Sequence, residues 1–459
     1  MSSELYERLR GLLDALSAHL IERDTEIRLS LLAALAGEHL LLLGPPGTAK
    51  SELARRLRHA LRDARYFERL LTRFSVPEEL FGPLSIVALE QDRYERQTAG
   101  FLPEASIAFI DEVFKANSAI LNALLTLLNE REFDNGSRRL RTPLVTVLAA
   151  SNEVPEDEAI AAFHDRFLLR CDVQPVGAGR FPELLALPDD IAITVPDACR
   201  FDHAELDALR QAAAAVALPA AVVELIADLR AWTLEQGIAV TDRRWRKLAQ
   251  LLRIAAHAHG RSQVDLWDCA LLVYGVGETA AQRATVAQWY GERLGTDRVL
   301  QPARLTRVVE SFEAQLEFER TATDLNYDAA GRLALETGAE DDDNGLRSSR
   351  RKGLSGFIRP KQYGERHIGA RVEQVGALLA EFDAALGGLD RIALELEETV
   401  RLHLWLPPDF ADRVREPLAV TRAVFAALRA RVIDVREGFA ALPLADEPGT
   451  APAPIAVDG

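Results

Sequence analysis

The fold of this chain is decided by Leu40-Leu41-Leu42-Leu43-Gly44-Pro45-Pro46-Gly47-Thr48-Ala49-Lys50-Ser51. The four leucines predict a short buried strand, and the leucines of residues 52–61 recur at helical spacing. A glycine-rich turn between a strand and a helix is the context that a phosphate-binding loop requires. The stretch therefore predicts an α/β domain organised around such a loop.

Residue chemistry explains why this loop suits a phosphate. Small residues let backbone N–H groups approach phosphate oxygens, and the N–H groups at a helix N-terminus are unpaired donors. The lysine would reach the β- and γ-phosphates as a point charge, and the serine hydroxyl would ligate Mg²⁺. The candidate nucleotide-binding residues are Gly44, Pro45, Pro46, Gly47, Thr48, Ala49, Lys50 and Ser51.

One position departs from the usual pattern, G-x-x-x-x-G-K-[ST], because Ala49 replaces the second glycine. A methyl group is expected to be tolerated there only if the residue has a negative φ. The alternative interpretation is an ordinary Gly/Pro turn with a chance lysine. The chain has 5 lysines and 49 arginines, which argues against a chance lysine at position 50.

The composition of the chain limits the classes of protein to which it can belong. A length of 459 residues suggests about three domains, and 48% hydrophobic with 27% charged residues is ordinary for a globular protein. The net charge of -16 argues against a general nucleic-acid binder. No apolar run predicts a membrane span and no signal-peptide core follows Met1. The isolated Cys171, Cys199 and Cys269 fit a reducing compartment, so we expect a cytoplasmic protein.

Strand and helix patterns alternate over residues 1–180. Further strands are expected at 66–72, 105–112 and 144–150, an apolar helix at 120–128, and a hairpin turn at Asn135-Gly136. Such alternation implies a mainly parallel sheet flanked by helices, in which ligands bind beyond the carboxyl ends of the strands. The residues expected to meet at that edge are Lys50, Asp111, Glu112 and Asn152.

The rest of the chain is predicted to be helical. Residues 181–295 form an all-α lid, and residues 296–323 with 366–442 form a discontinuous three-helix domain. Between the two parts of that domain, residues 324–365 carry blocks of charge with glycine and serine, as solvated linkers do. Residues 443–459 are rich in proline and alanine and are expected to be a disordered tail.

Hydrolysis of ATP needs more than a phosphate-binding loop. It also needs a metal, an oriented water and compensation for charge on the γ-phosphate. Asp111 ends an apolar strand, where it would hold Mg²⁺ together with Ser51, and Glu112 beside it would polarise water. The amide of Asn152 would contact the γ-phosphate or that water. The alternatives are that Asp111 caps the next helix, that Glu112 is surface charge and that Asn152 is a loop residue.

Two arginines are candidates for charge compensation. Arg166 precedes the apolar residues 167–169, and Arg243 opens a helix that follows Thr241. For each of them taken alone, the simplest interpretation is an arginine on the solvent-exposed surface. Other chemistry is poorly supported: there is no H-E-x-x-H motif, and His257 and His259 are expected to face different sides of a helix, so no metal site is expected there.

The order of these motifs resembles the MoxR branch of the AAA+ ATPases and, within it, the RavA-type regulatory ATPases. The similarity extends over about residues 20–290. RavA-type loops carry alanine where this chain has Ala49. The other segments that support the resemblance are Phe74-Ser75-Val76-Pro77-Glu78-Glu79-Leu80-Phe81-Gly82-Pro83-Leu84-Ser85, Gly100-Phe101-Leu102-Pro103-Glu104-Ala105, Leu121-Asn122-Ala123-Leu124-Leu125, Asn129-Glu130-Arg131, Ala149-Ala150-Ser151-Asn152-Glu153 and Asp242-Arg243-Arg244-Trp245.

The resemblance implies a role for each candidate. Lys50 and Ser51 would belong to Walker A, and Asp111 and Glu112 to Walker B as the metal-side and catalytic acids. Asn152 would be sensor 1, Arg166 the arginine finger of a neighbouring subunit's site, and Arg243 sensor 2, acting in cis from the lid. The family also implies ATP and Mg²⁺, a homo-hexamer and a partner with a von Willebrand factor A domain.

The chain departs from the RavA pattern near its end. Its helical segments are recognisable at residues 404–408, but the charged residues 324–365 stand where relatives carry an inserted β domain. A partner bound through that domain is therefore in doubt. The expected function is Mg²⁺-dependent ATP hydrolysis by a ring that remodels or matures other proteins. The alternatives are a nucleotide-gated adaptor with little turnover and a chelatase-like metal-insertion motor.

Overall fold

The computed structural model describes residues 4–153, 163–188, 193–295, 302–324, 359–407 and 410–455. They form two compact units. Unit 1 comprises Met1–Tyr290 with Glu397–Arg413, and unit 2 comprises Gly291–Leu396 with Val414–Gly459. No described helix is both long enough and apolar enough to span a bilayer.

Unit 1 contains a five-stranded sheet in the order β2-β3-β6-β1-β7. All neighbouring strands are parallel. The central strand β1 is a fully buried run of leucines, which pairs with β6 on one side and β7 on the other. The strands are β1 (Leu40–Leu43), β2 (Tyr66–Leu70), β3 (Ile107–Asp111), β6 (Thr146–Ser151) and β7 (Leu169–Asp172).

Four of these strands were predicted within two residues, but β7 was not. Arg170 interrupts its apolar pattern and lies almost completely buried inside the sheet. A buried guanidinium requires partners, and Arg170 donates to the carbonyl of His164. The strand was missed because one of its core positions holds a charged residue.

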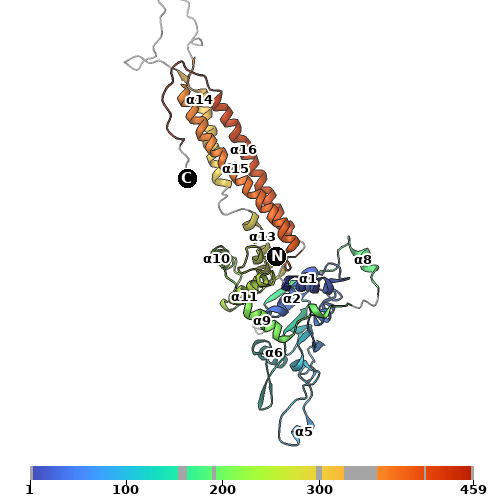
Figure 1. Cartoon of the computed structure of the whole chain (residues 1–459). Helices are drawn as coiled ribbons and strands as arrows, with labels where there is room; N and C mark the ends of the chain where they lie inside the picture. Colours follow the sequence, from blue (N-terminus) through green and yellow to red (C-terminus); the bar gives the residue numbers. More distant parts are fainter. Residues whose placement is uncertain are drawn as a thin grey trace, which may run out of the picture. The chain divides into compact units, whose positions relative to one another are not determined.

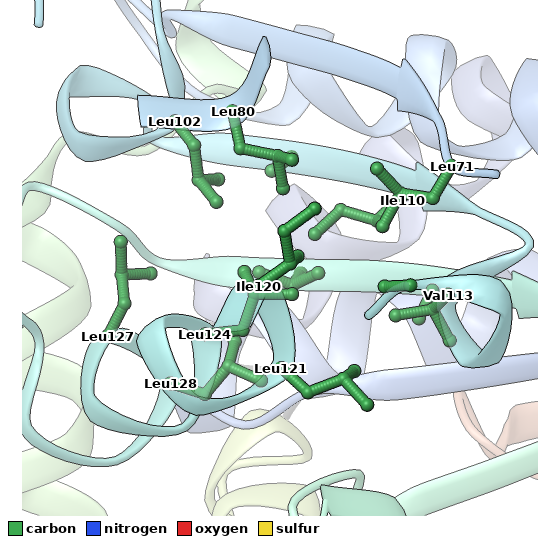
Figure 2. Packing of buried hydrophobic residues seen from close by; sticks show 14 of the residues in the cluster. Leu71, Leu80, Leu102, Ile110, Val113, Ile120, Leu121, Leu124, Leu127 and Leu128 are labelled. Atoms are coloured by element: carbon green, nitrogen blue, oxygen red, sulfur yellow. The ribbon is translucent and has the colours of Figure 1, made fainter. Parts of the chain in front are cut away.

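Helices cover the sheet. Their bounds are α1 (Glu4–Ser17), α2 (Asp24–Ala36), α3 (Lys50–Leu57), η1 (Arg58–Ala60), α4 (Glu78–Phe81), α5 (Ile86–Leu89), η2 (Leu102–Glu104), η3 (Val113–Lys115) and α6 (Ser118–Glu130). Figure 2 shows how α6 turns Ile120, Leu124 and Leu127 toward the sheet. These positions are three or four residues apart, so one face of the helix is buried. The Asn117 side chain caps the helix by accepting from the Ile120 N–H.

A two-stranded hairpin follows α6, formed by β4 (Glu132–Asn135) and β5 (Arg138–Arg141). Asn135 pairs with Arg138, so the two-residue turn is Gly136-Ser137 and lies one residue later than predicted. The Asn135 side chain is bound to the backbone of Arg96, both accepting from its N–H and donating to its carbonyl. The asparagine therefore joins the hairpin to the loop that contains α5.

The described part of residues 181–295 contains helices and no strand, as predicted for a lid. Its helices are α8 (Phe181–Leu185), η4 (Asp197–Cys199), α9 (His203–Ala213), α10 (Ala220–Glu235), α11 (Asp242–Ala258), η5 (Trp267–Leu272), α12 (Val273–Val276) and α13 (Ala280–Gly295). Helix α11 is joined to the residues before β1, because Lys247 donates to Glu38 at 2.6 Å.

Unit 2 contains the three expected long helices, which lie side by side (Figure 1). They are α14 (Pro302–Thr321), α15 (Glu365–Leu402, which belongs to unit 1 from Glu397 on) and α16 (Phe410–Ala440, which belongs to unit 1 up to Arg413), accompanied by β8 (Thr323–Asp324) and β9 (Arg359–Pro360). Apolar residues of all three helices share one core, for example Val309, Phe382 and Phe425. Most of the predicted linker, residues 325–358, lies outside the described residues.

Two predictions about the C-terminal part need correction. Residues 443–455 are not a disordered tail: Arg371 donates to the carbonyl of Ala453, and Ile455 packs against the core of unit 2. In addition, the segment Glu397–Arg413, which was assigned to the three-helix domain, belongs to unit 1. There Trp405 is buried and donates its indole N–H to Ala255 in α11.

Candidate active site

The predicted phosphate loop connects the carboxyl end of β1 to α3. Gly44 has a φ of +157° and lies so near β7 that a Cβ atom would be 2.2 Å from the Val173 carbonyl oxygen. Gly47, with a φ of +80°, also needs glycine's freedom. Both positions of the loop that need a glycine conformation, Gly44 and Gly47, are therefore occupied by glycine.

Ala49 contradicts the expectation of a negative φ, because its φ is +65° and its ψ is 24°. This left-handed conformation costs a residue with a Cβ about 1–2 kcal/mol. Ala49 is the N-cap residue of α3, and it provides no side-chain cap. The first N–H groups of α3 therefore stay available to an anion, as a nucleotide phosphate requires.

Lys50 is the first residue of α3, and its ammonium group donates to the carbonyls of Gly44 and Pro45, both at 2.8 Å. Burial lowers the pKa of Lys50, while the carboxylates of Asp111 and Glu112 act in the opposite direction. These interactions bring the lysine and the two acids to one place, as the sequence predicted.

The acids lie at the carboxyl end of β3. Asp111 is its last residue, and its Oδ1 accepts from the Glu112 N–H at 3.0 Å. Burial raises the pKa of Asp111, with the nearby Glu112 charge adding to the effect. Ser51, beside the phosphate loop, and Asp111 offer the hydroxyl and carboxylate oxygens that suit Mg²⁺. The chemistry of the site thus fits a Mg²⁺–nucleotide complex.

Glu112 adopts a left-handed conformation with a φ of 52°. Its Oε1 accepts from the Asn152 amide at 2.8 Å, and its Oε2 lies 3.2 Å from the ammonium of Lys115. Asn152 follows directly after Ser151, which pairs with Leu43 at the end of β1. Backbone strain of this kind is found where surrounding contacts hold a functional side chain. The glutamate is therefore held by Asn152 from a second strand end and by Lys115 from its own segment.

Sequence reasoning missed Arg23, which precedes α2 and is buried. Its guanidinium donates to the carbonyls of Thr48 in the loop, Glu22, and Gln174 after β7. The three bonds join the phosphate loop to two neighbouring segments, so Arg23 fixes the position of the loop. A single arginine between two helical patterns gives no signal that could have identified it.

The predicted arginines lie elsewhere. Arg243 donates to Oδ1 of Asn129 at 3.0 Å, near the C-terminal end of α6. That end of α6 lies beside the amino end of β1, because the Leu128 carbonyl contacts His39 and Arg131 donates to Gly37. Arg166 precedes β7, so it also lies near the amino ends of the parallel strands. Its pKa is lowered by burial and then by the positive charge of Arg243, so the two arginines are neighbours.

The structure does not bring Arg243, which was expected to act in cis, to the phosphate loop. Lys50 follows the carboxyl end of β1, whereas Arg243 and Arg166 lie at the amino edge. A four-residue strand spans about 13 Å, and β1 has that length. Arg243 therefore lies near the end of the sheet opposite the phosphate loop of its own chain.

A second polar cluster lies between the lid and the segment 397–413. His259, Asp268 and His403 have the composition of a metal site, but their nitrogens are already used. His259 accepts from the Leu404 N–H and bonds to the Ala255 carbonyl; His403 accepts from the Trp405 N–H and bonds to Asp268. No ring lone pair is left for a metal, so the cluster is a structural network.

A phosphate loop, an acidic pair and a polar residue at adjacent strand ends, joined to a helical lid, define a P-loop nucleotide-binding protein. Residues 7–210 match a family model described as the MoxR domain of MoxR–vWA–β-propeller ternary systems. Residues 221–290 match an AAA lid domain. Residues 7–290 therefore contain a MoxR-type AAA+ ATPase domain with its lid.

Individual relatives agree. An uncharacterized protein of Methanocaldococcus jannaschii is 38% identical over 272 residues, which cover 59% of this chain and 70% of the relative. Protein MoxR of Paracoccus denitrificans is 30% identical over 182 residues, or 38% of this chain and 53% of that protein. The crystal structure of a proposed ATPase from Cytophaga hutchinsonii shares the fold, with a TM-score of 0.50, 18% identity, and coverage of 59% and 86%.

Proposed function

We propose that this protein hydrolyses ATP with Mg²⁺ as a ring of subunits and uses the energy to remodel or mature partner proteins. The observation that supports hydrolysis is the meeting of Lys50, Asp111, Glu112 and Asn152 at one edge of the sheet. These groups cover the tasks of binding phosphate, holding a metal and preparing a water.

Each group has one task in this proposal. The backbone of the phosphate loop and Lys50 bind the β- and γ-phosphates. Ser51 and Asp111 would hold Mg²⁺, which neutralises charge on the phosphate oxygens when bound. Glu112 accepts a proton from the attacking water, and Asn152 holds Glu112 in the required orientation.

Charge compensation is proposed to come from a neighbouring subunit. Arg166 and Arg243 lie at the end of the sheet opposite the phosphate loop, and this position supports a role in the site of an adjacent subunit. A homo-hexameric ring would bring this edge of one subunit to the phosphate loop of the next. Arginine fingers supplied in this way accelerate phosphoryl transfer by about 10³–10⁵-fold.

Replacing Glu112 with glutamine tests the proposal. The amide keeps the shape of the side chain but is a poor proton acceptor, so Glu112→Gln should bind ATP with unchanged affinity and hydrolyse it at least about 100-fold more slowly. Binding is measured with a fluorescent nucleotide and turnover by phosphate release. Hydrolysis at the wild-type rate by Glu112→Gln protein would remove Glu112 from the proposed mechanism.

The proposed partner is a protein with a von Willebrand factor A domain. It is supported by the description of the matching family model, which places that MoxR domain in systems with a vWA component and a β-propeller. The RavA-type assignment and a cytoplasmic location remain part of this proposal, and three long helices in unit 2 support the former. Affinity capture with Glu112→Gln protein, which should hold ATP and a bound partner, tests it: recovery of no vWA protein would count against this partner.

A further inference from the structure

Arg244 is a buried and fully hydrogen-bonded charged side chain of the lid. It is 3% exposed, and all five of its N–H donors have acceptors. Nε donates to the Gly275 carbonyl. One terminal nitrogen donates to the carbonyl and the carboxylate of Asp165, at 3.1 and 3.0 Å. The other donates to the carbonyls of Phe167 and Leu168, at 2.8 and 2.7 Å.

These acceptors surround one residue. Asp165 precedes Arg166, and Phe167 and Leu168 follow it, so Arg244 holds the backbone on both sides of the proposed arginine finger. Within this turn, the only backbone bond of Arg166 among the described contacts runs from its N–H to the Phe163 carbonyl. The guanidinium from the lid is therefore a principal restraint on where this turn lies.

The same helix start supplies both neighbouring arginines. Thr241 caps α11 by accepting from the Arg244 N–H, which fixes the directions of the first side chains. Arg244 points into the protein toward the Arg166 turn, and Arg243 contacts Asn129 beside Arg166. A displacement of α11 would consequently move Arg166 and Arg243 together.

We propose that Arg244 is a positioning residue that couples the lid to the arginine finger. The inference rests on the proposed function, in which Arg166 completes the site of an adjacent subunit. Arginine is required because its planar fork spans four carbonyls and a carboxylate, whereas an ammonium has three donors at a single point. Through Arg244, the orientation of one subunit's lid controls hydrolysis in the next.

The test uses Arg244→Lys, which keeps the charge but cannot reproduce the fork. A misplaced finger should lower turnover by about 100-fold, while ATP affinity stays within about twofold because the phosphate loop of the same chain is untouched. A small amount of this variant is then mixed with excess Glu112→Gln protein, whose finger is intact and whose own sites are inactive. The turnover rate per Arg244→Lys subunit should then return to within about threefold of the reference rate. The reference is the rate per wild-type subunit in the same excess of Glu112→Gln protein.

Two controls separate the possible results. Arg166→Ala protein should be rescued by the same mixture; if it is not, the trans-acting finger of the proposed function fails, and the role of Arg244 fails with it. If Arg166→Ala is rescued and Arg244→Lys is not, only the inference about Arg244 is overturned, because its defect then lies in its own chain.

Arg210→Lys is the matched control. Arg210 also belongs to the lid and donates to backbone carbonyls, those of Ala34 and Leu35, but it does not contact the Arg166 turn. This substitution should leave the wild-type rate unchanged. Should Arg244→Lys fail to fold, Asp165→Asn replaces it: this change keeps the side-chain shape and weakens only the carboxylate–guanidinium bond, so a smaller loss with the same rescue is expected.

Discussion

The amide of Asn152 donates a hydrogen bond of 2.8 Å to Oε1 of Glu112. The bond joins the ends of β6 and β3, and it fixes a carboxylate that stands in a strained backbone conformation. An acid that must accept a proton from water works only when its lone pairs point toward that water. The bond therefore connects the polar residue after one strand to the proposed catalytic acid after the neighbouring strand.

Removing this bond should slow hydrolysis without weakening nucleotide binding. We expect Asn152→Ala to lower kcat by about 10–100-fold, because general-base catalysis contributes about 10²–10⁴-fold when the base is oriented. ATP affinity should change by less than about threefold. Steady-state kinetics and nucleotide titration measure the two effects.

Lys115→Ala provides the comparison, because Lys115 holds the other carboxylate oxygen of Glu112 at 3.2 Å but is largely exposed. Exposed ion pairs contribute at most about 1 kcal/mol, so this change should alter kcat by less than about fivefold. A loss with Lys115→Ala as large as that with Asn152→Ala would show that the amide has no special role.

Much of the fold follows from local patterns. The strands β1, β3 and β6 are apolar runs, and the residues after them were expected to meet because parallel strands end at a common edge. By contrast, β7 carries the buried Arg170 and was missed. Patterns of hydrophobicity identify the interior only where the interior is apolar.

The unpredicted features depend on contacts between distant residues. Arg23 reaches Thr48 and Gln174, and His403 reaches Asp268 across 135 positions of the chain. The sequence also contains no signal for which edge of the sheet the lid attaches to. That attachment places Arg243 beside Asn129, so its separation from the phosphate loop can be seen only in the tertiary structure.

Ala49→Gly should stabilise unit 1. The φ of +65° strains alanine, and glycine adopts it freely, although glycine also gains entropy in the unfolded chain. The net gain should be about 0.5–1 kcal/mol, read from the midpoint of denaturant unfolding. Ala54→Gly in the same helix is the control and should destabilise by at least about 1 kcal/mol. Loss of stability in both variants would contradict the strain assigned to Ala49.

Acid should destabilise unit 1 through its buried histidines. Burial, together with the positive charges of three nearby arginines, lowers the pKa of His164 to about 3. Burial likewise lowers the pKa of His259 to about 3. The unfolded chain binds these protons near pH 6.5 while the folded chain does not, so this stability is present above about pH 6.5 and is lost as the pH falls toward 3.

The variant His164→Phe tests this expectation, because it keeps a ring beside Phe114 and removes the titrating group. Between about pH 6 and 4, the unfolding free energy should depend on pH less steeply, by about 1.4 kcal/mol per pH unit for one proton. The free energy is measured by denaturant titration at several pH values. An unchanged slope would mean that His164 does not remain neutral in the folded protein.

Arg243→Ala tests whether Arg243 acts on the nucleotide site of its own subunit or on that of the adjacent subunit. Since Arg243 contacts Asn129 and lies beside Arg166 at the amino edge, we expect it to act on the adjacent subunit. The variant should lose at least about tenfold in turnover with unchanged ATP affinity, as expected for a group that acts on charge in the transition state. Mixing with excess Glu112→Gln protein should restore its rate, because each variant site then receives both arginines from an intact neighbour. If Arg243 served its own site, the defect would persist in every mixture, and ATP binding by the isolated variant would weaken as well.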